Sequence, residues 1–404
     1  MDKKRVVITG VGAISPLGLI MDENWNNLIN GKSGIKIVKK FESEEYRSHY
    51  AGEVENFDIK NYFNDNYINN IGLCSKFSLA ATKMALENAN LINNLPNNIG
   101  VAIGTTMGDV QELEKIDYAY YYNGYKSINP SDILNYPADR ISNNISRVFS
   151  INGPNITFTT ACAASNYAFG YGFDLINSGI TDIVIAGGAD VLSKVAFCGF
   201  SRIFAMATEK CQPFSLDRKG MIVSEGAIML IMESLESAIK RKANILAEFL
   251  GYGLSCDAFD ITIPHENGLG AIASMEKAIK SANIDKKDIG YISAHGTGTK
   301  ENDRVETLAI KNVFGDYSKE IAISSTKSMT GHLMGASSAL EAAICVKVVN
   351  EGIIPPTINY STPDPECDLD YVPNVAKKRD TKIALSNAFA FGGNNASIII
   401  KRWE

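Results

Sequence analysis

RVVITGVGAIS, at residues 5–15, is the stretch that decides the fold, because it has a weak echo in ILAEFLGYGLS at residues 245–255. Each is an apolar, β-rich run that leads into Gly-x-Gly and a turn. A second pair consists of ITFTTACAASNYAFG at residues 156–170 and IAISSTKSMTGHLMG at residues 321–335. Both join a strand-like run to a short polar loop and a helix that begins with small residues. The pattern predicts two copies of one α/β unit, packed face to face in a layered sandwich.

Apolar β-rich runs alternate with helix-length amphipathic stretches along the chain. Strands are expected at residues 5–12, 99–104, 156–161, 182–190, 227–233, 245–253, 289–296, 321–326, 383–393 and 396–403. Helices are expected at residues 76–90, 165–179, 234–242, 268–282, 302–314 and 333–350. This alternation is typical of an α/β protein with covered, mixed sheets. We divide the chain into an N-terminal half, residues 1–245, and a C-terminal half, residues 246–404.

The composition argues against several classes of protein. The 404 residues are 45% hydrophobic and 21% charged, as in a globular protein, and the N-terminus lacks the apolar region of a secretory signal. No apolar run approaches the roughly 18 residues of a membrane span. Seven cysteines without a C-x-x-C pair predict no disulfide framework and no structural zinc or other bound metal, and indicate the reducing cytoplasm. A net charge of −6 argues against nucleic acid as a partner.

The segment GVGAISPLG at residues 10–18 has some features of a dinucleotide-binding loop. In the pattern G-x-G-x-x-G, the third glycine would occupy the position of Ser15, and Pro16 would interrupt the start of the helix. We therefore expect no nucleotide site here.

The loop TTACAAS at residues 159–165 places Cys162 between an expected strand and an expected helix. A cysteine at a helix N-terminus feels the positive end of the helix dipole, which favours the thiolate, and Ser165 could cap that helix. The neighbouring alanines leave room for a substrate. On this loop alone, a nucleophile and a buried structural cysteine are equally compatible with the sequence.

Two of the four histidines support a nucleophilic site. His295 lies in AHGTGT directly after an expected strand, and His332 lies in STKSMTGHLMGA directly after another. Loops that follow strands position reactive groups at one edge of an α/β sheet. Because Cys162 occupies an equivalent loop, the three side chains form a coherent candidate for nucleophilic catalysis. His49 and His265 lie in polar stretches and carry no such signal.

Two further features in the C-terminal half are candidates for the same site. Glu341 falls inside the apolar run SSALEAAICV, so it either faces water or pairs with a cation such as Lys327. The paired glycines of NAFAFGGNNA, residues 387–396, permit a tight turn. The backbone N–H groups of such a turn can stabilise an oxyanion during acyl transfer.

The sequence resembles the β-ketoacyl-acyl carrier protein synthases, condensing enzymes of the thiolase superfamily, and most of all their type II elongating branch. The resemblance covers nearly the whole chain and is carried by the motifs TACAAS, PFSLDRKGMIVSEGA, AHGTGTKEND, SSTKSMTGHLMGA, PPTIN and FGGNNA. It implies a duplicated five-layer αβαβα sandwich that is usually dimeric. It also implies an acyltransferase that extends fatty-acid or polyketide chains by two carbons through decarboxylating Claisen condensation, giving a 3-oxoacyl carrier protein. No resident cofactor is implied, since the substrates arrive on the phosphopantetheine of acyl carrier protein.

The resemblance also assigns roles to the catalytic candidates. Cys162 matches the acyl-accepting nucleophile. His295 and His332 match the histidines that assist decarboxylation of the malonyl group and stabilise the enolate. Lys327 matches the lysine beside them, and Glu341 matches the glutamate partner of that lysine.

Further matches concern substrate binding. The N–H groups of Cys162 and Phe391 match the oxyanion hole, and Phe391 also matches a gating phenylalanine. The remaining matches are Thr297 and Thr299 for contact with the phosphopantetheine arm, Asp257 for a second mobile loop, Met107 for the depth of the acyl pocket and Arg202 for docking of the carrier protein. For Met107, ordinary core filling is the alternative.

The sequence departs from the family pattern at three places. The gate reads FAFGGNN, with Ala390 for glycine and Asn394 for threonine, and alanine adopts positive φ reluctantly. The cysteine loop reads CAASN. The helix expected to dock the carrier is NYFNDNYINNIGLCSK at residues 61–76, in which Lys76 is the one basic residue. These departures leave open a ketosynthase of a specialised polyene or type II polyketide pathway.

A thiolase and a non-catalytic chain-length partner are the two alternatives to a condensing enzyme. A thiolase would need a second cysteine in a C-terminal C-x-G loop, and the segment FGGNNA has none. A non-catalytic chain-length partner of a heterodimer would typically lose the nucleophile, whereas this chain keeps Cys162 and both histidines. We expect a homodimer, with a heterodimer as the alternative.

Overall fold

The computed structural model describes residues 4–96 and 98–404, and its core is a mixed sheet of ten strands. The strands of this sheet are, from one edge to the other, β10 (Ala322–Ser324), β9 (Ile289–Ser293), β13 (Ile383–Phe389), β14 (Asn394–Arg402), β8 (Ala247–Cys256), β1 (Val6–Ile14), β7 (Gly226–Ser234), β6 (Ile183–Asp190), β4 (Ile99–Gly104) and β5 (Asn155–Phe158). Two small ribbons pair β2 (Ile35–Ile37) with β3 (Tyr50–Gly52) and β11 (Ile353–Ile354) with β12 (Lys377–Lys378).

The order of the strands shows the duplication directly. Outward from the centre, β1, β7, β6, β4 and β5 pair antiparallel, antiparallel, parallel and parallel, and β8, β14, β13, β9 and β10 repeat this sequence of pairings. The two five-stranded halves join where Val6–Ile8 pairs antiparallel with Ala247–Phe249. The predicted repeat of one α/β unit is therefore confirmed, and β1 and β8 are its equivalent first strands.

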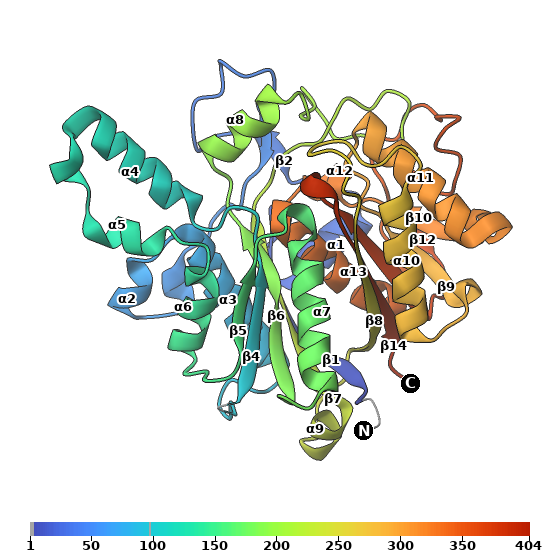
Figure 1. Ribbon diagram of the computed structural model, residues 1–404, viewed down its shortest axis with the longest axis horizontal. Coiled ribbons are helices and arrows are strands. Elements are labelled where there is room, and N and C mark those ends of the chain that lie inside the picture. Colours follow the sequence, from blue (N-terminus) through green and yellow to red (C-terminus); the bar gives the residue numbers. More distant parts are fainter. Residues whose placement is uncertain (1–3, 97) are drawn as a thin grey trace.

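The helices form three layers around the two halves of the sheet (Figure 1). α3 packs on β1 and β7, and α10 packs on β8 and β14, so these two helices lie on the outer faces. α7 and α13 contact each other and strands of both halves, which makes them the central layer. The helices are α1 (Met21–Ile29), α2 (Asn66–Asn69), α3 (Leu73–Asn88), α4 (Val110–Asn123), α5 (Pro130–Asn135), α6 (Arg140–Val148), α7 (Ala164–Asn177), α8 (Lys194–Arg202), α9 (Leu235–Lys240), α10 (Leu269–Ala282), α11 (Lys300–Phe314), α12 (Lys327–Thr330) and α13 (Ser337–Glu351). The result is the predicted five-layer αβαβα sandwich.

The two Gly-x-Gly segments have a common structural reason. Gly12 lies inside β1, where an added Cβ would be 2.0 Å from the carbonyl oxygen of Ala81 in α3. Gly253 lies inside β8, where an added Cβ would be 2.1 Å from the carbonyl oxygen of Ser274 in α10. The glycines thus let the outer helix of each half approach the sheet. Both glycines lie within strands.

The sequence prediction was incomplete between residues 61 and 148. The segment 61–76 is not one helix, because it is divided into α2, a break and the first turn of α3. Helices α4 to α6 were not predicted, and α4 and α5 project from the body of the molecule (Figure 1). None of the helices in the described part of the chain is long and apolar enough to cross a membrane.

Candidate active site

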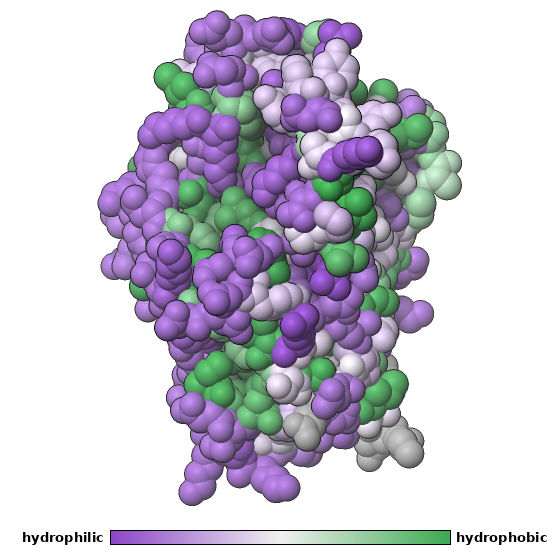
Figure 2. Space-filling view, turned by 90° about the vertical axis from the view of Figure 1, so that its left-hand side faces the viewer, coloured by the Kyte–Doolittle hydropathy of each residue, from purple (hydrophilic) through white to green (hydrophobic). Residues whose placement is uncertain are grey.

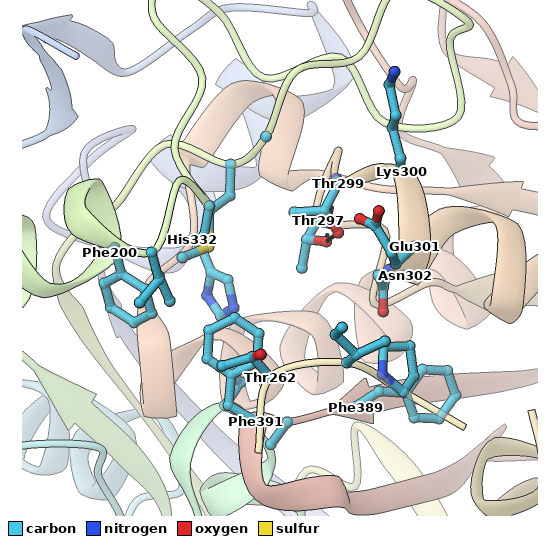
Figure 3. Close-up of a pocket in the computed structure, with 18 of the residues that line it drawn as sticks. Phe200, Thr262, Thr297, Thr299, Lys300, Glu301, Asn302, His332, Phe389 and Phe391 are labelled. Carbon is cyan, nitrogen blue, oxygen red and sulfur yellow. Dashed lines mark hydrogen bonds between the residues drawn. The ribbon is translucent and has the colours of Figure 1, made fainter. Parts of the chain in front are cut away.

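Equivalent loops of the two halves bring the predicted catalytic residues together. Cys162 follows β5, and His332 follows the equivalent strand β10 after one short helix. His295 follows β9. All three side chains line one cavity of about 550 Å³, together with Thr297, Thr299, Asp257 and Phe391. In the close-up the ring of His332 points into this cavity, opposite the two threonines, with Phe391 along another wall (Figure 3).

The thiol of Cys162 lies among small apolar side chains, with 6% of the residue exposed. It packs in a cluster with Ala163, Ala388, Ala390 and Ala396. Burial raises the pKa of the Cys162 thiol to about 12, although the positive charge of Lys327 acts in the opposite direction. The expected thiolate is therefore not the resting state: burial outweighs the cationic neighbour, and the thiol stays protonated at neutral pH.

The turn that carries Cys162 is strained, and its cap differs from the prediction. Ala161 adopts a φ of +48°, which a residue other than glycine rarely does and which is common at functional sites. Ser165 does not cap α7. Its hydroxyl instead donates a hydrogen bond of 2.5 Å to the carbonyl oxygen of Gly335, because the turn after His332 lies against this end of α7.

The two histidines are buried neutral bases whose rings meet edge to face. The ring centroids of His295 and His332 lie 5.5 Å apart at an interplanar angle of 81°. Burial lowers the pKa of both imidazoles well below the usual value, and the charge of Lys327 adds to the effect. Neutral imidazoles can donate an N–H to a developing negative charge without carrying a positive charge into a dry cavity.

The hydrogen bonds of His332 fix which ring nitrogen carries its hydrogen. The backbone N–H of Met334 donates to Nδ1 at 3.0 Å, so Nδ1 is the acceptor and Nε2 is protonated; the hydroxyl of Ser337 lies 2.8 Å from the same Nδ1. The Nδ1 atom of His295 is buried and has no hydrogen-bond partner among the described residues. In His332, Nε2–H is therefore the ring hydrogen that is left for a substrate.

Lys327 and two buried glutamates hold the backbone of the His295 loop. Lys327 pairs with Glu341, as expected if that glutamate is buried, and its ammonium group also donates to the carbonyl oxygen of His295 at 2.6 Å. Glu306 accepts the N–H groups of His295 and Gly296, each at 2.8 Å. Burial raises the pKa of both Glu306 and Glu341 to about 7. The sequence did not single out Glu306, although it lies in an expected helix and is completely buried.

The loop that carries Thr297 and Thr299 is held by Arg218, a residue that was not predicted to belong to the site. The hydroxyl groups of Thr297 and Thr299 lie 2.9 Å apart at the cavity. The guanidinium group of Arg218 donates to the carbonyl oxygens of Thr299 at 3.2 Å and Lys300 at 3.1 Å, and it pairs with Asp364. The sequence could have indicated this arginine through its place in the motif PFSLDRKG. The structure shows that Arg218 is buried.

The gate segment is hydrogen-bonded to the loop that carries Asp257. Asp257 donates its backbone N–H to the carbonyl oxygen of Gly393 at 2.9 Å, and its carboxylate accepts from the Asn395 side chain at 2.9 Å. Ala390 has a φ of −112°, so alanine introduces no strain in this conformation. The ring of Phe391 lies 6.1 Å from that of Phe200.

Met107 and Arg202 lie outside the cavity wall. Met107 is partly buried and packs in the same apolar cluster as Phe200, behind the ring that contacts Phe391. Arg202 is exposed at the last residue of α8, next to Ile203, which does line the cavity. Their predicted roles in chain length and carrier docking remain predictions.

Comparison with known proteins places this site in a family. Residues 3–238 match the model for the β-ketoacyl synthase N-terminal domain, and residues 246–361 match that for the β-ketoacyl synthase C-terminal domain. The chain belongs to the β-ketoacyl synthase family, and it is a condensing acyltransferase of the thiolase fold, as the sequence predicted.

Relatives and solved structures agree with this assignment. The chain is 38% identical over 409 residues to "3-oxoacyl-[acyl-carrier-protein] synthase 2" of Staphylococcus aureus strain COL, covering 99% of each chain. It is 37% identical over 413 residues to the protein of the same name from Synechocystis, covering 100% of this chain and 99% of that one. Among solved structures, "The ishigamide ketosynthase/chain length factor" is 39% identical with a TM-score of 0.96, and each chain is covered completely.

Proposed function

We propose that the protein is a 3-oxoacyl-[acyl-carrier-protein] synthase that loads an acyl group onto Cys162 and condenses it with malonyl carrier protein. The observation that carries this proposal is the single cavity in which one thiol, two neutral imidazoles and two threonine hydroxyl groups meet. The relatives named above support the use of acyl carrier protein as substrate. The acyl groups arrive on a phosphopantetheine arm, so the chemistry requires no resident cofactor.

In the first step, the sulfur of Cys162 attacks the acyl thioester. A new C–S bond forms, the bond to the carrier's sulfur breaks, and the proton of the Cys162 thiol ends on the departing carrier thiol. The backbone N–H groups of Cys162 and Phe391 stabilise the tetrahedral oxyanion. Thr297 and Thr299 hold the arm and so convert a bimolecular reaction into one between positioned groups.

In the second step, malonyl carrier protein loses CO₂. The C–C bond to the carboxylate breaks, and its electron pair becomes the enolate of the thioester. His332 donates its Nε2–H to the enolate oxygen, and His295 adds a second contact on the same side. The enolate carbon then attacks the acyl group, a C–C bond forms, and the Cys162 sulfur leaves as a thiolate. A proton from solvent restores the thiol, which its raised pKa favours.

The test is incubation with isotopically labelled acyl carrier protein and malonyl carrier protein. A 3-oxoacyl carrier protein two carbons longer, with one CO₂ released per product, supports the proposal. Transfer to coenzyme A without decarboxylation would support thiolase chemistry instead.

The rim of the cavity suits an acidic carrier protein. Exposed Arg47, Lys219 and Lys300 line it beside the apolar Ile203 and Phe204, although Asp260 and Glu301 share the rim. Arg202 lies next to this surface. Arg202→Glu should raise the KM for carrier-borne substrates and make the effect salt-dependent. Lys76→Glu, in the sparsely charged segment 61–76, is the matched control and should change the KM less.

We infer that the protein forms a homodimer in the cytoplasm. β5 ends the large sheet and pairs on one side only among the described residues, which leaves an edge for pairing with a second copy. On helix α4, which projects from the body of the molecule, exposed aromatic side chains gather, a composition typical of interfaces: Tyr118, Tyr120, Tyr121 and Tyr122. The surface on this side of the molecule mixes apolar and hydrophilic patches (Figure 2). The proposal of a reducing compartment rests on the sequence, whose seven cysteines include no C-x-x-C pair.

A specialised polyketide or polyene pathway is the second candidate. The high TM-score to the ishigamide structure favours it, as does a TM-score of 0.92 and 31% identity to the ketosynthase in the structure "AntDE:AntF (apo): type II PKS acyl-carrier protein in complex with its ketosynthase bound to the hexaketide". In that case the partner would be a chain-length factor. Measurement of the molecular mass in solution, for the protein alone and with the products of neighbouring genes, distinguishes a homodimer from a heterodimer. Mass spectrometry of the acyl groups carried by Cys162 distinguishes a fatty-acid pathway from a polyketide pathway.

A further inference from the structure

The turn that follows His332 is held in a strained conformation. Met334 has a φ of +53°, and a side chain other than glycine keeps such a backbone only where its surroundings enforce it. Nδ1 of His332 has two neighbours, the Ser337 hydroxyl at 2.8 Å and the N–H of Met334 at 3.0 Å. The hydroxyl can donate or accept, whereas the N–H can only donate, so the strained residue selects the histidine tautomer. Gly335 is bound through both of its backbone groups: its carbonyl accepts from Ser165, and its N–H donates to Asp190 at 2.7 Å.

Asp190 joins this turn to the loop that carries Met107. The carboxylate lies at the end of β6 and is completely buried. Besides the N–H of Gly335, it accepts the hydroxyl of Thr105 at 2.8 Å and the N–H groups of Thr106 at 2.8 Å and Met107 at 3.0 Å. Four donors from two distant segments therefore converge on one carboxylate. The reaction described above gives Asp190 no role.

At Gly335 the His332 turn is packed closely against Asp190 and Thr106. An added Cβ at Gly335 would lie 2.7 Å from the carboxylate oxygen of Asp190 and 2.7 Å from the backbone nitrogen of Thr106. The His332 turn and the Met107 loop thus touch each other through the carboxylate. A shift of either segment must move or break the bonds that Asp190 makes to the other.

We propose that Asp190 is a positioning residue for His332: it holds the 332–335 turn so that the Met334 N–H stays on Nδ1 and the hydrogen of the ring stays on Nε2. This inference rests on the proposed function, in which Nε2–H is the donor to the enolate. Without the carboxylate, the strained turn relaxes and Nδ1 loses the Met334 N–H. The Ser337 hydroxyl, 2.8 Å from Nδ1, remains, but a hydroxyl accepts a hydrogen as readily as it donates one. The ring then also populates the tautomer that has no hydrogen facing the substrate. Asp190 also transmits changes at Met107 to the decarboxylation step.

The test compares Asp190→Asn with Glu233→Gln. Asparagine has the shape of aspartate, but its NH₂ group is a donor and cannot accept the hydrogens that the carboxylate accepts. Glu233 is the control, because it is completely buried at the end of β7, accepts the hydroxyl groups of Thr9 at 3.1 Å and Ser237 at 2.8 Å, and pairs with Arg241, outside both the His332 turn and the Met107 loop. Ser165→Ala removes the other bond to Gly335 and covers the case in which Asp190→Asn does not fold.

Three measurements are made on each variant: decarboxylation of malonyl carrier protein, acyl loading of Cys162, and the histidine tautomers by ¹⁵N NMR. The chain has four histidines, which keeps the spectra assignable. In Asp190→Asn we expect kcat for decarboxylation to fall at least about 10-fold with KM nearly unchanged, since loss of a complete donor costs roughly 10²–10³. Loading should change less than about threefold, and the His332 signals should shift from the Nε2–H form toward the Nδ1–H form. Ser165→Ala should show the same changes to a smaller extent.

Two results would overturn the inference. One is a variant at Asp190 that keeps the parental decarboxylation rate and His332 tautomer. The other is an equal loss in Glu233→Gln, which would reduce the effect to general destabilisation. Failure of the parental protein to decarboxylate malonyl carrier protein would instead refute the proposed function, while the NMR comparison would still test the positioning role.

Discussion

The ammonium group of Lys327 lies between the side chain of Glu341 and the backbone carbonyl of His295, to which it donates at 2.6 Å. One buried cation thus anchors the loop of one histidine, five residues before the other histidine in the chain. The same charge lowers the pKa of both imidazoles and opposes the effect of burial on Cys162. The charge of Lys327 therefore acts on the protonation of all three catalytic side chains.

The pair of Lys327 and Glu341 should behave as a unit in stability measurements. Lys327→Met leaves the glutamate buried without its cation, and we expect the free energy of unfolding to fall by about 3–5 kcal/mol. The double variant Lys327→Met, Glu341→Gln should recover most of that loss, since no charge is then left unpaired. Chemical denaturation of the two single variants and the double variant measures the coupling. Strictly additive losses would contradict the pairing.

The histidines should affect decarboxylation much more than loading. In His332→Ala and in His295→Ala, the oxyanion N–H groups and the Cys162 thiol remain, so loading persists. Removal of one donor to the enolate should slow decarboxylation by about 10²–10³. The two rates are measured separately, by CO₂ release and by the intact mass of the acylated enzyme. A parental rate of CO₂ release in either variant would show that its imidazole has no part in this step.

The reactivity of Cys162 should keep rising in alkaline solution. The folded protein raises the pKa of this thiol to about 12, and the thiolate is the reactive form. Alkylation of Cys162 by iodoacetamide should therefore accelerate about tenfold per pH unit from about pH 7 to 9, without a plateau. Peptide mass spectrometry follows Cys162, with the exposed Cys256 as an internal reference for the reagent. A plateau below pH 8 would show that a thiolate already exists in the resting site.

Met107 provides the prediction on chain length. Methionine is unbranched and pliable, and Met107 packs in the same cluster as Phe200, which contacts the gate Phe391. Met107→Ala should favour longer acyl groups, and Met107→Trp should restrict loading to short ones, because each buried methylene is worth roughly 1–3 kcal/mol of discrimination. The measurement is the ratio of kcat/KM for long and short acyl carrier proteins. Equal ratios in three folded proteins would leave Met107 as ordinary core.

The sequence predicted the strands and the duplication because buried strands of an α/β protein are continuous apolar runs, as in IGVAIG and DIVIAGGAD. It missed α4 because VQELEKIDYAYYYN has no apolar stripe, and Tyr118, Tyr121 and Tyr122 lie exposed. Arg218 was missed although its motif was noted. Glu306 accepts from residues only 10 and 11 positions before it, but an acidic residue in a helix is usually exposed, so its burial was not expected. Asp190 could not be recognised in advance, because its partners lie in segments far away in the chain and such contacts leave no local pattern. The cap predicted at Ser165 was wrong for the same reason, since its partner Gly335 belongs to the other half.

The central claim is that the acyl group is carried by Cys162, and the most direct test is the intact mass of the protein and of Cys162→Gln after incubation with acyl carrier protein. The account predicts one acyl adduct on the parental protein, located at Cys162 by peptide mapping. It predicts no adduct on Cys162→Gln, in which decarboxylation of malonyl carrier protein continues because both histidines remain. An adduct of equal yield on Cys162→Gln would contradict the account and move the nucleophile to another residue.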